Sequence, residues 1–302
     1  MKAAVCPKAG SPDVLQYTEE AKPVPKAHEV LIKVHYATVT SGDVKMRRFS
    51  RLVLAIVGTL FGFKAMKIPG IEYAGEVEET GSEVTSFMKG DAVSGTTTGL
   101  RYGANAEYVC VPEKPKIGVI TRKPQGVTFK QAAAATVGAM TALQLLKGAK
   151  IKAGDRVLIY GASGSVGSYA VQLAKHFGAE VTAVCSTSNL ELVRSIGANH
   201  VIDYTKEDFT LNGQQYDIVF DAVGKLSKSR CRNSIAGNGR YTSVRSLTRE
   251  KVDELEYVQE LAASGEVKVL IDREYPLEQI AAAHGYVESG RKKGNVVIHV
   301  AD

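Results

Sequence analysis

The N-terminal part of the chain alternates apolar and polar residues over short stretches. The clearest is EVLIKVHYATVT, from Glu29 to Thr40, and others are KAAVC, IEYAGEVEETG and DAVSGT. A period of two places alternate side chains on one face, which is typical of a half-buried β-strand. Pro23 and Pro25 lie in a connector between the first two stretches. The pattern predicts a largely β domain over residues 1 to 109.

One segment of this region does not alternate. Residues 47 to 68, RRFSRLVLAIVGTLFGFKAMKI, hold too many apolar residues for a connector. Two interpretations stay open, a buried helix of the β domain and a mobile wall of an apolar substrate pocket.

The period changes after residue 128. The Ala-rich segment from Phe129 to Lys147 predicts one helix, and Arg156 to Tyr160 predicts a short buried strand. A glycine-rich turn, a helix with one apolar face and a second strand from Glu180 to Val184 follow. Strand, turn, helix and strand within about 30 residues make one βαβ unit.

The turn of this unit has the sequence GASGSVG, from Gly161 to Gly167. In the frame G-x-G-x-x-G, Gly164 lets a backbone approach a pyrophosphate and Gly167 lets helix and strand pack closely, while Ala162 replaces the first glycine. A plain tight turn is the alternative, but the strand before and the helix after favour a dinucleotide site. The expected cofactor contacts here are Ser163, Gly164, Ser165 and Val166.

Further strands and helices alternate beyond the βαβ unit. NLELVRSIG predicts a helix, HVIDY, YDIVFDAVG and NGRYTSV predict strands, and a charged helix is expected from Arg249 to Ser264. Such alternation is typical of a parallel sheet.

Composition narrows the class of protein. A chain of 302 residues with 44% hydrophobic and 23% charged residues has the size for two globular domains, and no apolar run approaches the roughly 20 residues of a membrane span. The four cysteines are scattered, which together with an N-terminus without an apolar signal core predicts a cytoplasmic protein. The net charge of +6 is spread along the chain, so nucleic acid binding is not expected, although an anionic cofactor would be attracted.

An ordered set of motifs carries a family resemblance. PGIEYAGEV, VTSFMKGDAV, GANAEYV, AAAATVGAMTALQLL, VLIYGASGSVG, VIDYTKEDF and ESGRKKGNVVI together resemble the zinc-independent quinone oxidoreductases, the zeta-crystallin-like branch of the medium-chain dehydrogenase/reductase superfamily. The resemblance implies an α/β fold, with a Rossmann doubly wound parallel sheet and a GroES-like β-rich catalytic domain. Residues 1–122 and 265–302 would form the catalytic domain, and residues 123–264 the NADP-binding domain.

Zinc-dependent members of that superfamily hold a catalytic metal through Cys, His and Cys. Here Thr40 stands where the first Cys would be and Ile71 where the His would be. The six histidines form no i, i+4 pair. Without thiolate or imidazole ligands, no metal site is expected.

The residues after the second strand of the βαβ unit decide whether the cofactor is NAD(H) or NADP(H). An NAD enzyme places Asp or Glu there, but this chain reads CSTSN from Cys185 to Asn189. No carboxylate would repel a 2′-phosphate, so NADP(H) is favoured. Its phosphate would rest on Ser186, Ser188, Asn189 and Tyr204, unless Ser186 and Ser188 serve mainly as N-caps of the helix near Leu190.

The nicotinamide end, by resemblance, would lie in the cleft between the domains. Thr141, Val223 and Asn295 would contact the cofactor there, with Thr40 and Lys45 on the catalytic-domain wall and Asp43 in a structural role. A solvated surface position is the alternative for Lys45.

The chemistry expected of these parts is a reduction. Without a metal or a His/Asp constellation, the substrate must accept hydride readily, as quinones and α,β-unsaturated carbonyls do. Lys45 or Thr40, a backbone N–H or water would stabilise the oxygen that gains charge. The alternative is an NADPH-binding protein with little catalysis, a redox-sensing or RNA-binding partner.

The oligomeric state is predicted from a segment that is shorter in this chain than in the family. Relatives usually place a sixth strand before the charged helix, but only Arg245 to Thr248 remain here. The sheet should stop at five strands, so we expect a monomer, or a dimer not built through a continuous Rossmann sheet.

Overall fold

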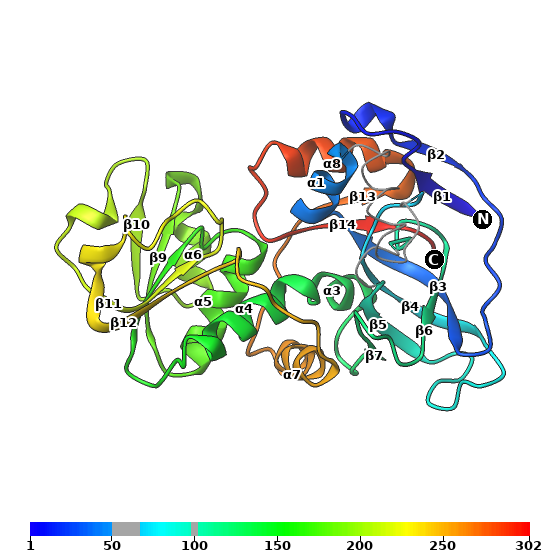
Figure 1. Cartoon of the computed structure of the whole chain (residues 1–302), viewed down its shortest axis with the longest axis horizontal. Helices are drawn as coiled ribbons and strands as arrows, with labels where there is room; N and C mark the ends of the chain where they lie inside the picture. The colour runs from blue at the N-terminus through cyan, green and yellow to red at the C-terminus, as the bar shows by residue number, and fades with distance from the viewer. Residues whose placement is uncertain (50–66, 98–101) are drawn as a thin grey trace. The chain divides into compact units, whose positions relative to one another are not determined.

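The computed structural model describes residues 1–49, 67–97 and 102–302 (Figure 1). These residues form two compact units, each assembled from separate parts of the chain. The β-rich unit consists of Met1–Val137, Glu250–Gln259 and Ile271–Asp302. The parallel-sheet unit consists of Gly138–Arg249 and Glu260–Leu270. The domain limits expected at residues 122 and 264 stay predictions.

The β-rich unit is built on a mixed, mainly antiparallel sheet. Its strands are β1 (Lys2–Val5), β2 (Gln16–Glu19), β3 (Glu29–Thr38), β4 (Glu72–Thr80), β5 (Ala92–Thr96), β6 (Tyr108–Pro112), β7 (Ile120–Arg122), β13 (Ile271–Pro276) and β14 (Asn295–His299). The described strands of the main sheet run in the order β13-β14-β3-β4-β5-β7, with β6 also paired to β3 and with β1 and β2 in a separate pair. The helices are α1 (Ser41–Arg48), α3 (Phe129–Ala134) and α8 (Ile280–Glu288), with single turns η1 (Pro12–Val14) and η5 (Leu277–Gln279).

The core of this unit follows the predicted alternation. Val30, Ile32 and Val34 on β3 are fully buried and belong to one apolar cluster. Leu31 on the opposite face of the same strand is also buried, because α3 packs against β3. The C-terminal strand β14 pairs with β3, so residues far apart in the chain complete one sheet.

The parallel-sheet unit matches the predicted doubly wound arrangement. Its strands are β8 (Arg156–Tyr160), β9 (Glu180–Cys185), β10 (His200–Asp203), β11 (Tyr216–Asp221) and β12 (Ile235–Ser243). Its helices are α4 (Val137–Gly148), α5 (Ser165–His176) and α6 (Leu190–Ser195), with the single turns η2 (Thr187–Asn189), η3 (Phe209–Leu211) and η4 (Arg232–Ser234). Helix α7 (Val252–Ala263) is divided between the two units, because its residues up to Gln259 belong to the β-rich unit and those from Glu260 to the parallel-sheet unit. All strand pairs are parallel, in the order β10-β9-β8-β11-β12. The chain starts at the central strand β8 and extends to either side, which creates a topological switch point between β8 and β11.

The described part of this sheet has five strands, as predicted, and β12 forms one edge. β12 is longer than the segment NGRYTSV suggested. Its pairing with β11 jumps from Tyr216 opposite Ile235 to Ile218 opposite Arg240, so residues 236–239 bulge out of the ladder. A bulge on an edge strand hinders the addition of another strand.

The prediction of a single Ala-rich helix from Phe129 to Lys147 is wrong, because the chain forms α3 and α4 with a break between them. Ala135 leaves helical geometry, with φ of −93° and ψ of 44°. The Val137 N–H donates to the Glu72 carboxylate of β4 at 2.9 Å rather than continuing the helix. A tertiary hydrogen bond therefore overrides a strong local propensity.

Two expectations concern apolar segments. The segment 47–68 lies, apart from its ends, outside the described residues. Among the helices that the structure does describe, none combines the length and the apolar character needed to cross a bilayer.

Candidate functional site

The glycine-rich turn joins β8 to α5 and is held by the protein's own backbone at two points. Gly161 has a φ of +79°, which favours glycine, and its N–H donates to the Val184 carbonyl at 3.0 Å. A Cβ on Gly167 would lie 2.1 Å from the Gly161 carbonyl oxygen. Both glycines are therefore required by the fold itself.

Gly164 differs from these two glycines. Its φ of −79° and ψ of 178° suit any residue, and a Cβ there would meet only the Gly161 oxygen, at 3.5 Å. No described atom explains why this position lacks a side chain. Gly164 is the N-cap of the twelve-residue helix α5 and gives it no side-chain cap. The turn thus leaves open space at a helix N-terminus, where an anion such as a pyrophosphate fits.

The rest of the turn surrounds that space. Ser163, Gly164, Ser165 and Val166 are partly exposed, whereas Ala162 and Gly167 are buried. The start of α4 packs against the turn, because a Cβ on Gly138 would lie 2.4 Å from the Ser165 hydroxyl oxygen. Thr141 follows Gly138 by three residues and so lies on the same side of α4, one turn along.

The loop after β9 is tied to the turn by one amide. The Asn189 Nδ2 donates to the Ser163 Oγ at 3.0 Å and to the Ser186 Oγ at 3.2 Å, and the Ser188 Oγ lies 3.4 Å from the Ser186 Oγ. The Asn189 side chain is buried, yet its Oδ1 has no hydrogen-bond partner among the described residues. An unpartnered buried acceptor is costly, so this group is suited to a ligand.

The alternative of N-capping serines finds no support in the hydrogen bonds. Ser186 precedes η2 without a side-chain capping bond, and α6 begins after Asn189, again without one. The Ser186 hydroxyl instead accepts from the Asn189 amide, and the Ser188 hydroxyl lies beside that of Ser186.

Asp203, at the end of β10, supports this loop and was missed from the sequence. Its carboxylate accepts from the Thr187 hydroxyl at 2.5 Å and from the Thr205 hydroxyl at 2.7 Å. These bonds, from Thr187 first, lower the pKa of Asp203. The carboxylate is engaged with these hydroxyls, and the nearby stretch from Cys185 to Asn189 stays neutral.

Tyr204 contacts the same loop through its backbone. Its N–H donates to the Cys185 carbonyl at 3.1 Å. Its side chain is 54% exposed, and its ring centroid lies 6.4 Å from that of Tyr160. The two rings line a cavity of about 380 Å³ together with Lys206 and Arg230. Arg230 lies on a different connection, and spacing along the chain gave no sign that it would come here.

Val223 lies on the loop after β11, and a second missed carboxylate shapes this loop. Asp221 is fully buried and accepts the backbone N–H groups of Val223 at 3.0 Å and Gly224 at 2.8 Å. Val223 itself is 44% exposed and packs close to Gly161, where a Cβ would come within 2.2 Å of its Cγ2. The loop and the glycine-rich turn are thus neighbours.

In the β-rich unit, Thr40 is the N-cap of α1. Its Oγ1 donates to the Asp43 Oδ2 at 2.6 Å and accepts from the Asp43 N–H at 3.1 Å, and its own N–H donates to the same Oδ2 at 2.8 Å. This reciprocal capping box occupies the Thr40 hydroxyl. Burial raises the pKa of Asp43.

Asn295 and Lys45 differ in their surroundings. Asn295 begins β14 and is buried near Thr40, because the Val39 N–H donates to the carbonyl of the next residue, Val296, at 3.1 Å. Lys45 lies on α1, is exposed, and makes no ion pair with any residue of the described ranges.

Glu72 is the third carboxylate missed from the sequence. It accepts from the Thr38 hydroxyl and from the Val137 N–H at 2.9 Å, and burial raises its pKa to about 7. Nearby, burial lowers the pKa of Lys292 to about 8 although Glu72 opposes that shift, and its Nζ donates to the Gly294 carbonyl at 2.7 Å. The motif PGIEYAG contained Glu72, but no pattern indicated a buried carboxyl group there.

Within residues 1–49, 67–97 and 102–302, no three His, Cys, Asp or Glu side chains converge as a metal site would require. Ile71 offers no ligand atom, and Thr40 is occupied by its capping box.

Both units of the chain are similar in sequence to known protein families. Residues 26–122 match the alcohol dehydrogenase GroES-like domain, and residues 165–256 and 244–298 match two models described as zinc-binding dehydrogenase. The chain is 34% identical to the 2-methylene-furan-3-one reductase of Solanum lycopersicum and to the chloroplastic NADPH-dependent alkenal/one oxidoreductase of Arabidopsis thaliana, covering 99% of this chain and 79% of each relative. It is 32% identical to a chloroplastic quinone-oxidoreductase homolog of Spinacia oleracea, over 96% of this chain and 95% of the relative.

A solved structure extends the likeness to the whole fold. The quinone oxidoreductase of Coxiella burnetii superposes with a TM-score of 0.86 at 30% identity, covering 100% of this chain and 99% of that one.

Proposed function

Because the chain belongs to the medium-chain dehydrogenase/reductase superfamily, in its quinone oxidoreductase branch, we propose that it reduces quinones or α,β-unsaturated carbonyls with NADPH and without zinc. As a member it is a pyridine-nucleotide-dependent oxidoreductase. The substrate class, the NADPH preference and the independence from zinc are the proposed parts. The relatives named as alkenal/one and furanone reductases support the substrate class.

The observation that carries the proposal is the open space at Gly164. The protein's own packing does not require a glycine there, while a pyrophosphate does. Ser163, Ser165 and Val166 would hold the pyrophosphate at the start of α5. Thr141 and Val223, close to the same turn, would face the nicotinamide half. Asn295 is assigned to that half from the family resemblance alone.

The neutral loop after β9 supports NADPH. Ser186, Ser188, Asn189 and Tyr204 offer hydroxyl and amide donors, and no carboxylate lies between Cys185 and Asn189. The Asn189 amide group suits a phosphate if its orientation is reversed. Its Oδ1 would then accept from the Ser163 and Ser186 hydroxyls, and its Nδ2 would donate to the ligand.

Bound NADPH supplies the hydride in this reaction. The residues of the chain must stabilise the substrate oxygen that gains negative charge, and deliver the proton. Of the two candidates, the Thr40 hydroxyl already donates to Asp43, whereas the Lys45 ammonium group is free of any ion pair with the described residues. We therefore assign charge stabilisation to Lys45 and the positioning of α1 to Thr40.

Consumption of NADPH tests the proposal. The purified protein is mixed with NADPH and a panel of quinones and enones, and absorbance is followed with a no-substrate control. Lys45→Met should lower kcat/KM by about 10²-fold, as loss of one charge-stabilising donor does, while Lys89→Met, at another exposed lysine, should not. NADPH binding without turnover of any substrate would instead support the alternative of a weakly catalytic redox-sensing or RNA-binding protein.

A further inference from the structure

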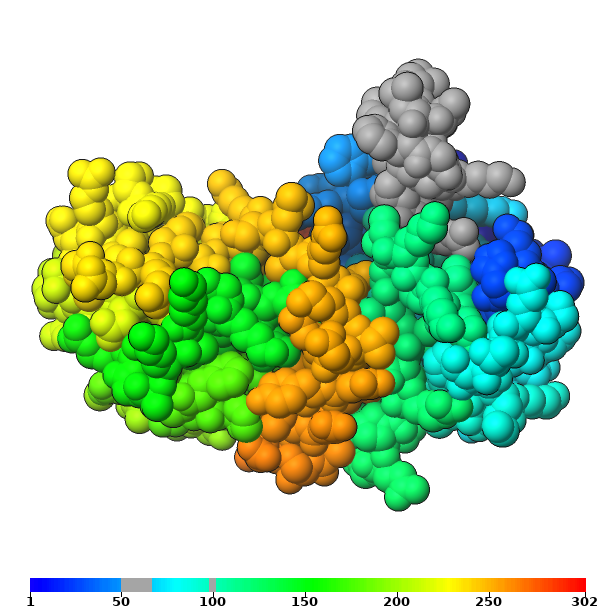
Figure 2. Space-filling view, turned by 60° about the horizontal axis from the view of Figure 1, so that its bottom comes forward, coloured from blue at the N-terminus to red at the C-terminus, as the bar shows by residue number. Residues whose placement is uncertain are grey.

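The connection between β11 and β12 lacks a crossover helix. Parallel strands are normally joined by a crossover helix that packs on the sheet. Residues 222–234 contain only the single turn η4. Leu226 and Cys231 are buried against the sheet, and the residues between them are exposed. Figure 2 shows this connection at the molecular surface, in yellow.

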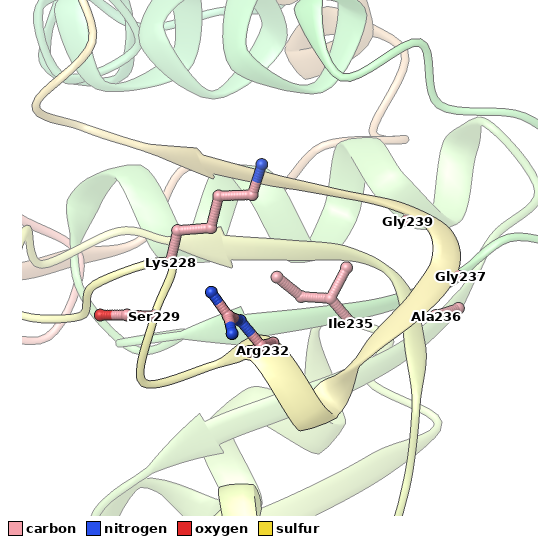
Figure 3. A pocket seen from close by; sticks show the side chains of 7 residues that line it. All are labelled: Lys228, Ser229, Arg232, Ile235, Ala236, Gly237 and Gly239. Atoms are coloured by element: carbon pink, nitrogen blue, oxygen red, sulfur yellow. The ribbon is translucent and has the colours of Figure 1, made fainter.

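A hollow of about 540 Å³ lies where the helix would be (Figure 3). Lys228, Ser229 and Arg232 line it from the connection, and Ile235 and the backbone at Gly237 and Gly239 line it from β12. This volume falls within the range of sites for small organic ligands, which is roughly 300–1,000 Å³.

The bulge of β12 shapes one wall of the hollow. A Cβ on Gly239 would lie 2.8 Å from the Tyr216 carbonyl oxygen, so the bulge requires that glycine. A Cβ on Gly237 would meet no described atom within 4 Å. The backbone at Gly237 is therefore bare without any packing reason, which leaves it accessible to a ligand.

The charges of the hollow are uncompensated. Lys228 and Arg232 both line it, no carboxylate lines it, and neither side chain forms an ion pair with any residue that the structure describes. Arg230, between them in sequence, is instead paired with Asp208 at 3.0 Å. Figure 3 labels Lys228, Arg232 and Ile235 among the residues that line the hollow. Two cations beside an apolar side chain favour an anionic group with an organic body.

We propose that this hollow binds the phosphate group of a small phosphorylated organic molecule. The Arg232 guanidinium group donates two parallel N–H groups to phosphate oxygens, while the Lys228 ammonium and the Ser229 hydroxyl donate to the others. Ile235 and the bare backbone at Gly237 contact the organic body. The site takes its ligand by ion pairing and contact alone, with no covalent step.

The hollow is separate from the nucleotide turn. Ile235 is in register with Tyr216, at the amino end of β11, whereas the turn follows the carboxyl end of β8. Because β8 and β11 are parallel neighbours, the hollow and the turn lie at opposite ends of the strands. The inference therefore does not depend on the proposed reaction.

Titration calorimetry with phenyl phosphate tests the site, with phenol and inorganic phosphate as comparisons. Saturating NADP⁺ is present so that phenyl phosphate does not bind at the glycine-rich turn. We expect a Kd of about 1 mM for phenyl phosphate, weaker binding of inorganic phosphate and none of phenol. The double variant K228Q/R232Q should bind phenyl phosphate at least tenfold more weakly, and K225Q, a cation on the same connection outside the hollow, should change Kd by less than about twofold.

Equal binding to the double variant and the parent protein, or no binding of phenyl phosphate at all, would overturn the proposal. Binding of an acidic peptide or an RNA oligonucleotide that depends on Lys228 and Arg232, without binding of phenyl phosphate, would also overturn it. All substituted side chains are exposed, and an unchanged melting temperature shows that the variants fold. If NADP⁺ does not bind, the proposed function fails, but the comparison between the two variants still reports on the hollow.

Discussion

The Asn189 Nδ2 donates to the Ser163 Oγ at 3.0 Å, across 26 positions of sequence. This hydrogen bond joins the loop after β9 to the glycine-rich turn, so the groups expected to hold the adenosine phosphate and the pyrophosphate form one continuous surface. The sequence motif and the family resemblance predicted separately that each segment contacts a nucleotide. Their direct link through one amide is a finding of the structure.

Cofactor choice should reverse in Ser186→Asp. A carboxylate at this position would repel a 2′-phosphate and accept from ribose hydroxyls, which changes the affinity ratio of NADPH to NADH by roughly ten- to hundredfold, or about 1–3 kcal/mol. Fluorescence titration with both nucleotides measures the ratio. Ser195→Asp, which adds the same charge on α6, is the matched control and should leave the ratio unchanged. Equal affinity of the parent protein for both nucleotides would contradict our account of this loop.

The glycine-rich turn offers a paired test. Gly164→Val should weaken nucleotide binding by about a hundredfold or more while the protein stays folded, because the side chain fills only the ligand's space. Gly167→Val should instead destabilise the fold, since its Cβ would lie 2.1 Å from the Gly161 carbonyl oxygen. Circular dichroism melting and nucleotide titration separate the two effects. A folded Gly164→Val protein with normal affinity would refute the placement of the pyrophosphate.

Activity should survive removal of metal. Thr40 and Ile71 provide neither thiolate nor imidazole, so dialysis against a strong chelator should leave NADPH-dependent reduction unchanged. Metal analysis of the purified protein should find no stoichiometric zinc. Activity that is lost on chelation and restored by added zinc would disprove this prediction.

The parts of the molecule that sequence predicted well are those with a local signal. The strand from Arg156 to Tyr160 and the turn that follows it have a period and a glycine pattern of their own, and the structure has them at the same residues. The stop at five described strands followed from the short connection after Val244. The strand and the turn depend on neighbouring residues only, whereas the limit of five strands was predicted from a comparison with the family.

The parts that sequence missed depend on distant contacts. The break between α3 and α4 comes from Glu72, which lies 65 positions before Val137. Asp221 shapes the Val223 loop with a side chain whose burial no local pattern indicated. The missing helix between β11 and β12 left the hollow at Arg232, and a strand prediction on either side did not reveal it.

Assembly can be predicted from the β12 edge. Residues 236–239 bulge out of the ladder, so a second copy cannot continue the sheet through this part of the strand. We expect the mass of a single chain, or of a dimer formed through another surface, from light scattering after size exclusion. A crystal structure with a continuous sheet between two copies through β12 would show that the bulge does not block pairing.

Stability should depend on pH through Glu72. Burial raises the pKa of Glu72 from its ordinary 4.5 to about 7, because the neutral carboxyl is favoured in the folded state. The folded protein thus binds more protons than the unfolded chain between these two values. This contribution to stability is fully present below pH 4.5 and is lost as pH rises through 7, by about 3 kcal/mol for a shift of this size.

Glu72→Gln should remove this decline. The glutamine Oε1 still accepts the Val137 N–H and carries no charge at any pH, so the free energy of unfolding of the variant should fall less than that of the parent between pH 5 and 8. Urea unfolding across this window measures the difference, and Glu207→Gln, at an exposed glutamate, is the matched control. Parallel curves for the parent protein and Glu72→Gln would mean that Glu72 is not the group that titrates. A decline that is removed at Glu72 alone would show that this buried carboxyl group holds a proton at neutral pH.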